Sequence, residues 1–65
     1  MINEHKKRMF EEEANEKMKD LVLKNPHCIF GVVVYDAGTR EGEVVIQKEK
    51  PSGEITDYVI GCANE

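Results

Sequence analysis

Only four side chains in this sequence have the chemistry of a thiol nucleophile, its base or a soft-metal ligand: His5, His27, Cys28 and Cys62. A thiolate activated by an imidazole is the pair that thiol enzymes use, and His27 directly precedes Cys28. Adjacent side chains of an extended chain point to opposite faces, however, so a hydrogen bond between these two is awkward. The spacing also matches no C-x-x-C or H-x-x-x-H metal pattern. We therefore expect no catalytic residue, no metal and no cofactor.

The segment 36–42, DAGTREG, concentrates residues that could contact a ligand or a partner: Asp36, Thr39, Arg40 and Glu41. Its glycines resemble a phosphate-binding loop only superficially, because there is no G-x-x-x-x-G-K-[ST] motif and no helix follows. Four carboxylates could act as an acid–base pair, but no spacing selects two of them: Asp36, Glu41, Glu43 and Asp57. The sequence predicts a hairpin loop, and loops on a rigid scaffold often carry binding residues.

One helix is expected to hold these segments in place, from about Asn3 to Lys24. This stretch is rich in Glu, Lys, Met and Ala and contains neither Gly nor Pro. Asn3 is a suitable N-cap, and Pro26 ends the helix. With 100° per residue, one apolar stripe forms the expected core-facing side: Phe10, Ala14, Met18, Leu21 and Val22.

After Pro26 the pattern becomes that of strands, at residues 28–35, 43–49 and 55–62. The links are short, and Pro51 and Gly53 favour a tight turn, so successive strands should pair antiparallel in the order 1-2-3. In the second strand, Val44 and Ile46 point to one face, which the helix can cover. The predicted fold is a single α+β domain over residues 1–65, a helix on a three-stranded antiparallel meander (αβββ).

The charge balance narrows the class of partner. Nine basic and thirteen acidic residues give a net charge of −4, which disfavours binding to nucleic acid. The cluster Lys6, Lys7 and Arg8 is small and acidic residues follow it, so we interpret it as a solvated helix face. No apolar run is long enough to span a membrane, and the charged N-terminus does not resemble a signal peptide. We expect a cytoplasmic protein with reduced thiols.

The segment 28–35 does not fit a small monomer. The meander places it at the edge of the sheet, yet it is the most apolar strand and carries no charge. Uncharged, apolar edge strands pair readily with other chains. We predict that a second copy covers it, by antiparallel pairing or by packing of sheet on sheet, with these interface residues: Cys28, Ile29, Phe30, Val32, Val33, Val34 and Tyr35.

These patterns predict a small non-enzymatic binding protein (an adaptor, regulator or inhibitor) that acts as a homodimer or higher homo-oligomer. A chain of 65 residues has difficulty enclosing a ligand pocket on its own. One alternative is a small-molecule-binding or sequestering protein with sites between subunits, lined by residues such as Tyr35, Arg40 and Tyr58. A second alternative is a thiol enzyme that uses Cys28 and His27.

Overall fold

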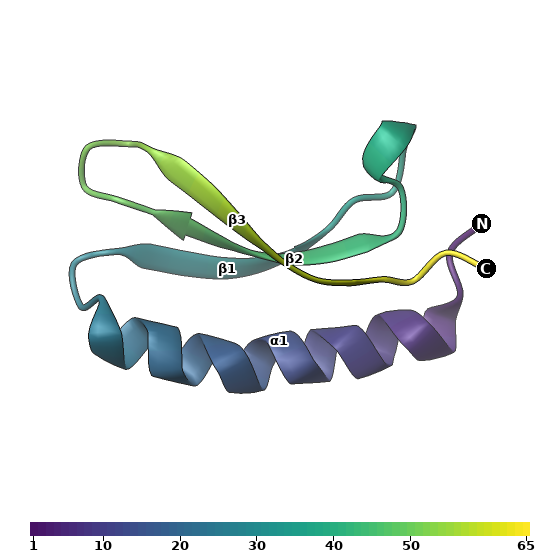
Figure 1. Ribbon diagram of the computed structural model, residues 1–65, viewed down its shortest axis with the longest axis horizontal. Coiled ribbons are helices and arrows are strands. Elements are labelled where there is room, and N and C mark those ends of the chain that lie inside the picture. The colour runs from purple at the N-terminus through teal and green to yellow at the C-terminus, as the bar shows by residue number, and fades with distance from the viewer.

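The computed structural model describes all residues from 1 to 65 and has one helix on a three-stranded sheet (Figure 1). Its elements in chain order are α1 (Glu4–Lys24), β1 (Ile29–Val34), the 3₁₀ turn η1 (Gly38–Arg40), β2 (Glu43–Glu49) and β3 (Ile55–Cys62). The strands pair antiparallel in the order β1-β2-β3. The predicted αβββ fold is confirmed.

Side-chain caps define both ends of α1. The Asn3 side-chain oxygen accepts a hydrogen bond from the Lys6 amide at 3.0 Å, as expected of an N-cap. At the other end, the backbone and side-chain amides of Asn25 both donate to the Leu21 carbonyl. The predicted core stripe is right except at Val22, whose side chain is 46% exposed. Val22 lies about 100° around the helix from Leu21, at the margin of the face that meets the sheet.

The strand register sorts the side chains into two faces. Val32 pairs with Ile46, and Ile46 pairs with Tyr58, so these three lie on the face toward α1. Between β2 and β3 the register shifts at Val44/Val45, a β-bulge that moves the pairing from Val59 to Gly61. The β1–β2 register has no such interruption. β1 is therefore a regular strand along its whole length.

The core between helix and sheet is small. Ala14, Val44 and Ile46 are fully buried at its centre. Half-buried apolar side chains surround them: Phe10, Met18, Leu21, Phe30, Val32, Val34, Tyr58 and Ile60. Val45 is also fully buried although it points away from α1, between Val33 of β1 and Val59 of β3. A single layer of side chains thus carries most of the hydrophobic stabilisation.

The ring of Phe10 in α1 packs directly against Gly61 of β3. A Cβ atom on Gly61 would lie 2.6 Å from Cζ and 2.7 Å from Cδ1 of the Phe10 ring, closer than any real contact of that kind. The absent side chain of Gly61 therefore makes room for the aromatic ring. Gly61 follows the bulge, where the sheet backbone is already displaced.

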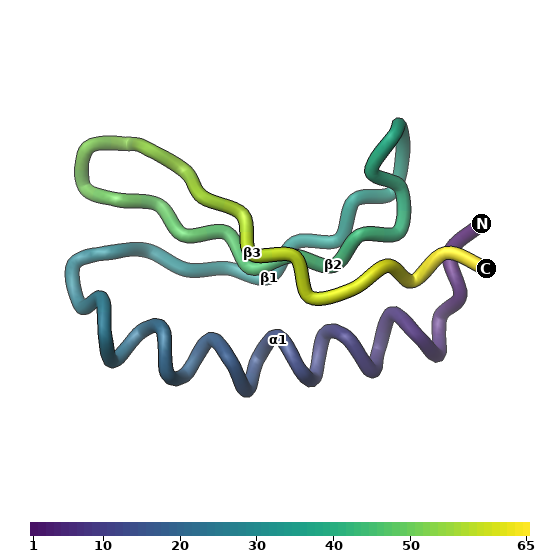
Figure 2. Tube along the Cα trace, in the orientation of Figure 1, coloured from purple at the N-terminus to yellow at the C-terminus, as the bar shows by residue number.

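The two ends of the chain lie side by side (Figure 2). The Asn3 amide donates to the Ala63 carbonyl at 2.7 Å, the Glu65 amide donates to Met1 at 3.1 Å, and Ile2 forms a β-bridge with Asn64. We call this pairing of residues 1–3 with residues 63–65 the terminal clasp. It is joined to the β1–β2 connection because the Ala63 amide donates to the Gly42 carbonyl at 2.7 Å.

Candidate functional site

The face of the sheet turned away from α1 is the outer face, and no element covers it. Alternation along the paired strands places on it Ile29, Gly31, Val33 and Tyr35 of β1 and its end, Glu43, Val45, Gln47 and Glu49 of β2, and Ile55, Asp57 and Val59 of β3. The β1–β2 connection and the β2–β3 hairpin both bend away from α1 (Figure 1), so the outer face is concave.

A cluster of polar side chains extends over the outer face from its Tyr35–Glu43 end to the row of Gln47 and Asp57. Arg40 is at its centre: its Nε donates to Glu43 at 2.7 Å, and its Nη1 donates to Asp57 at 2.9 Å. The Tyr35 hydroxyl donates to the same Asp57 oxygen at 2.9 Å and accepts from Arg40 at 3.2 Å. The guanidinium also stacks over the Tyr35 ring, 4.3 Å from its centroid. We call these residues, with Gln47, the Arg40 cluster.

The electrostatics of the Arg40 cluster keep its charges paired. Hydrogen bonds from Arg40 and then from Tyr35 lower the pKa of the Asp57 carboxyl below its ordinary value. The hydrogen bonds to Glu43 and then to Asp57 raise the pKa of the Arg40 guanidinium. One cation thus serves two carboxylates, and Gln47 adds a long hydrogen bond of 3.5 Å to the Tyr35 hydroxyl. Because Arg40 is engaged within the chain, the cluster fastens the β1–β2 connection onto the sheet.

The structure brings only part of the predicted loop to this cluster. Asp36 and Thr39 are exposed, and Glu41 lies 3.3 Å from the terminal amino group of Met1. Arg40 alone folds back onto the outer face. Glu43 and Asp57, two of the four carboxylates that spacing could not separate, do come together, but as partners of Arg40. Tyr58 packs in the core beneath α1 and therefore does not join Tyr35 and Arg40 within the chain.

No pattern in the sequence singled out Gln47 or Asp57 as a member of this cluster. The pairing register of β2 with its two neighbouring strands is the information that would have identified these two residues. Gln47 pairs with Gly31 on one side and with Asp57 on the other. Val33 and Val45 form the next row of the same face, between the Gln47–Asp57 row and the Tyr35–Glu43 end, so the cluster extends across this apolar row.

We expect Asp57 to make the free energy of unfolding depend on pH. Its folded-state pKa is lowered, so its contribution is present above the unfolded pKa of about 3.9 and is lost as pH falls through the folded value. We expect the free energy of unfolding to fall below about pH 4, and to fall less in Asp57→Asn. Urea titrations at a series of pH values measure this. Asp36→Asn, which changes an exposed carboxylate without a salt bridge, should keep the wild-type slope.

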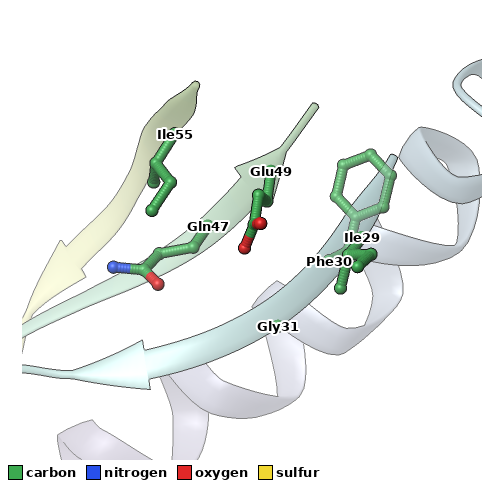
Figure 3. A pocket seen from close by; sticks show the side chains of 6 residues that line it. All are labelled: Ile29, Phe30, Gly31, Gln47, Glu49 and Ile55. Carbon is green, nitrogen blue, oxygen red and sulfur yellow. The ribbon is translucent and has the colours of Figure 1, made fainter. Parts of the chain in front are cut away.

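Two hollows mark the surface. The first, of about 160 Å³, lies on the outer face and is lined by Ile29, Phe30, Gly31, Gln47, Glu49 and Ile55. In Figure 3, Gln47 and Glu49 project from β2, the strand between the one that carries Ile55 and the one that carries Ile29. The second, of about 360 Å³, lies between α1 and β3, where Lys17 and Asp20 supply its charged groups. Ligand pockets usually measure about 300–1,000 Å³ and gather several polar groups at one point. The first hollow is smaller than this range, and the second, although within it, has only Lys17 and Asp20 as charged groups.

The two cysteines lie at opposite ends of the sheet, and only Cys62 is next to the Arg40 cluster, where it pairs with Glu43. Cys28 precedes β1 and is half-buried, while Cys62 ends β3 and is exposed, and both are free. The register sets Cys62 opposite Glu43 and Ile29 opposite Glu49, at the two ends of β2. His27 is exposed in the turn before Cys28. No three His, Cys, Asp or Glu side chains gather where they could hold a metal ion.

The predicted interface residues form one open edge of the molecule. Ile29 is 70% exposed, and every other residue of β1 is half-buried. Phe30, Val32 and Val34 point toward α1, whereas Ile29 and Val33 lie on the outer face, as the alternation predicted. β1 pairs with β2 on one side only. Its other side has no neighbour within the chain.

Comparison of the chain with protein-family models, with curated proteins and with solved structures gives no match. No helix combines the length and the apolar character needed to cross a membrane.

Proposed function

We propose that this chain is a small cytoplasmic binding protein (an adaptor, regulator or inhibitor) that acts as a homo-oligomer. The observation that carries the proposal is the open edge of β1. This strand is wholly uncharged and its Ile29 side chain is 70% exposed. Proteins ordinarily protect such an edge with charge, proline or a bulge. A second copy of the chain is the simplest partner for this edge, because it is always present at the same concentration as the first.

The thin core supports the same proposal. Only six of the 65 residues are buried, and a domain of this size gains roughly 3–5 kcal/mol from its core alone. Both cysteines are free, so no disulfide adds to this. Association would supply further buried surface and raise the stability with concentration. The free thiols also support the cytoplasmic location, where thiols remain reduced.

The proposal is tested by measuring the mass in solution by sedimentation over a wide dilution series. We expect an oligomer that dissociates on dilution. Val33→Lys places a charge on the open strand and should weaken association about tenfold or more. The matched control is Leu23→Lys, which changes a side chain that is 79% exposed on α1 and should leave association unchanged. A wild-type monomer at the highest concentration, or equal effects of both changes, would contradict the proposal.

A further inference from the structure

We propose that two copies join through β1, paired antiparallel with Val32 opposite Val32, so that two three-stranded sheets become one of six strands. The inference rests on the proposed homo-oligomer and specifies its surface. It also places both helices on one side of the joined sheet and leaves both concave outer faces on the other.

The backbone of β1 offers hydrogen-bonding groups to a partner. The Tyr35 amide donates to the Glu43 carbonyl at 3.0 Å, and in an antiparallel ladder such bonded positions alternate. Val33, Gly31 and Ile29 therefore direct their N–H and C=O groups toward β2. The corresponding groups of Phe30, Val32 and Val34 point to the open edge. A second β1 strand would satisfy them with about six hydrogen bonds.

The other free edge, β3, is less suited to this contact. Asp57 lies in the middle of β3 and is already held by Arg40, so pairing at that edge would crowd two charged clusters together. The bulge in β3 between Val59 and Gly61 also disturbs the regular ladder. β1 has neither feature. Among the two edges of the sheet, β1 is the one built for regular pairing.

Packing of one outer face on another is disfavoured. It would remove water from the Arg40 cluster, and burying charged groups costs several kcal/mol per ion even when they are paired. Glu49, which forms no salt bridge, would be buried as well. Two concave faces also meet only at their rims (Figure 1). The edge contact avoids all three penalties.

In three twofold registers, the N–H and C=O groups at the open edge of one copy can bond to those of the other. These registers are centred on Gly31, Val32 or Val33. A centre at Gly31 places two glycines opposite each other and leaves the outer face without side chains there. A centre at Val33 places Phe30 opposite Asp36. The centre at Val32 pairs apolar residues throughout: Phe30 with Val34, Gly31 with Val33, and Ile29 with Tyr35. Pairs of aromatic and β-branched residues across strands are stabilising.

The polar residues at the two ends of β1 are compatible with the same register. His27 precedes the strand and Asp36 follows it, and both are exposed and without a salt bridge in the chain. With Val32 at the centre, Cys28 lies opposite Asp36 of the second copy, and His27 is its neighbour. The twofold axis repeats this arrangement at both ends of the paired strands.

The helices leave room for the contact and gain from it. α1 lies over the whole sheet, so the two helices would be about three strand spacings, or 14 Å, apart, more than the 8–10 Å of packed helices. Lys17 and Leu21 line the hollow on the β3 side. Val22 is rotated from Leu21 in the direction away from Lys17 and thus lies on the β1 side. Its exposed side chain faces the space between the two helices.

Three single-cysteine variants distinguish the registers in a chain carrying Cys28→Ala and Cys62→Ala, once sedimentation shows that this chain associates as the wild type does. A cysteine at the centre of the pairing meets its own copy at a Cα distance of about 5 Å, whereas one residue off centre it is about 8 Å away. Disulfides need less than about 7 Å. With oxidised glutathione, we expect Val32→Cys to form a disulfide-linked dimer at least tenfold faster than Gly31→Cys or Val33→Cys. Val59→Cys on β3 is the control and should remain unlinked.

The outcomes separate this inference from the proposed function. Preferential crosslinking of Val32→Cys in an associating chain supports the paired edge and its register. Association with preferential crosslinking at Gly31, Val33 or Val59, or with none at any position, overturns the inference and leaves the homo-oligomer standing. A chain that is monomeric by sedimentation overturns both. Gly31→Cys is accommodated in the fold because its Cβ would meet nothing within 4 Å.

Discussion

Replacing Gly61 by alanine is expected to destabilise the fold by about 1–3 kcal/mol, the usual cost of forcing extra atoms into a packed core. The new methyl group would occupy the space of the Phe10 ring, 2.6 Å from its Cζ atom. Because Phe10 projects from α1, the ring must turn or the helix must move from the sheet. Urea unfolding at one low protein concentration gives the change in free energy.

Gly31→Ala is the matched control, since it adds the same methyl group to another strand glycine with open space around it. Its effect should be neutral or slightly stabilising, because alanine restricts the unfolded chain more than glycine does. The double variant Gly61→Ala with Phe10→Ala should be less destabilised than the sum of the single changes. Additive effects would show that the ring and the glycine do not oppose each other.

Ile46→Ala is expected to be the most damaging change to the core, at about 2–5 kcal/mol. Ile46 is among the largest side chains with no exposure to solvent and lies at the centre of the layer under α1. That loss is comparable with the whole stability of a domain of this size, roughly 3–5 kcal/mol. At low concentration a large fraction of Ile46→Ala should be unfolded, as loss of the helical circular dichroism signal would report.

The control for this change is Val59→Ala on the outer face, which is 58% exposed and should cost less than about 1 kcal/mol. If Val59→Ala were as destabilising as Ile46→Ala, Val59 would have to be buried in the folded protein, which it is not in the single chain. Raising the concentration of Ile46→Ala should recover part of its helical signal, because association draws the chain toward the folded state.

The elements of this fold are predictable because each has a strong local signal. Asn3 and Pro26 mark the ends of the helix, and the change from a period of 3.6 to a period of 2 after Pro26 marks the strands. Short links then leave the antiparallel meander as the simplest arrangement. The prediction that Val22 belongs to the core is wrong. The angular positions of residues around the helix do not show how wide a strip of the helix surface the sheet covers.

The arrangement of the site is less predictable, because it depends on contacts between residues far apart in the chain. The sequence marked Arg40 as a loop residue, but its position over Tyr35 depends on how the connection bends after η1. Asp57 was one of four equivalent carboxylates until the β2–β3 register placed it opposite Gln47. The terminal clasp had no signal at all, since it forms through backbone groups of residues 1–3 and 63–65.

The clasp has a mechanical consequence. Its hydrogen bonds follow one another inward from the two termini, so a force that separates the ends loads them one at a time, as in a zipper, instead of shearing them together. Pulling on the two termini would therefore open the terminal clasp first and at low force. The sheet beyond Gly42 would bear load only after the clasp had opened.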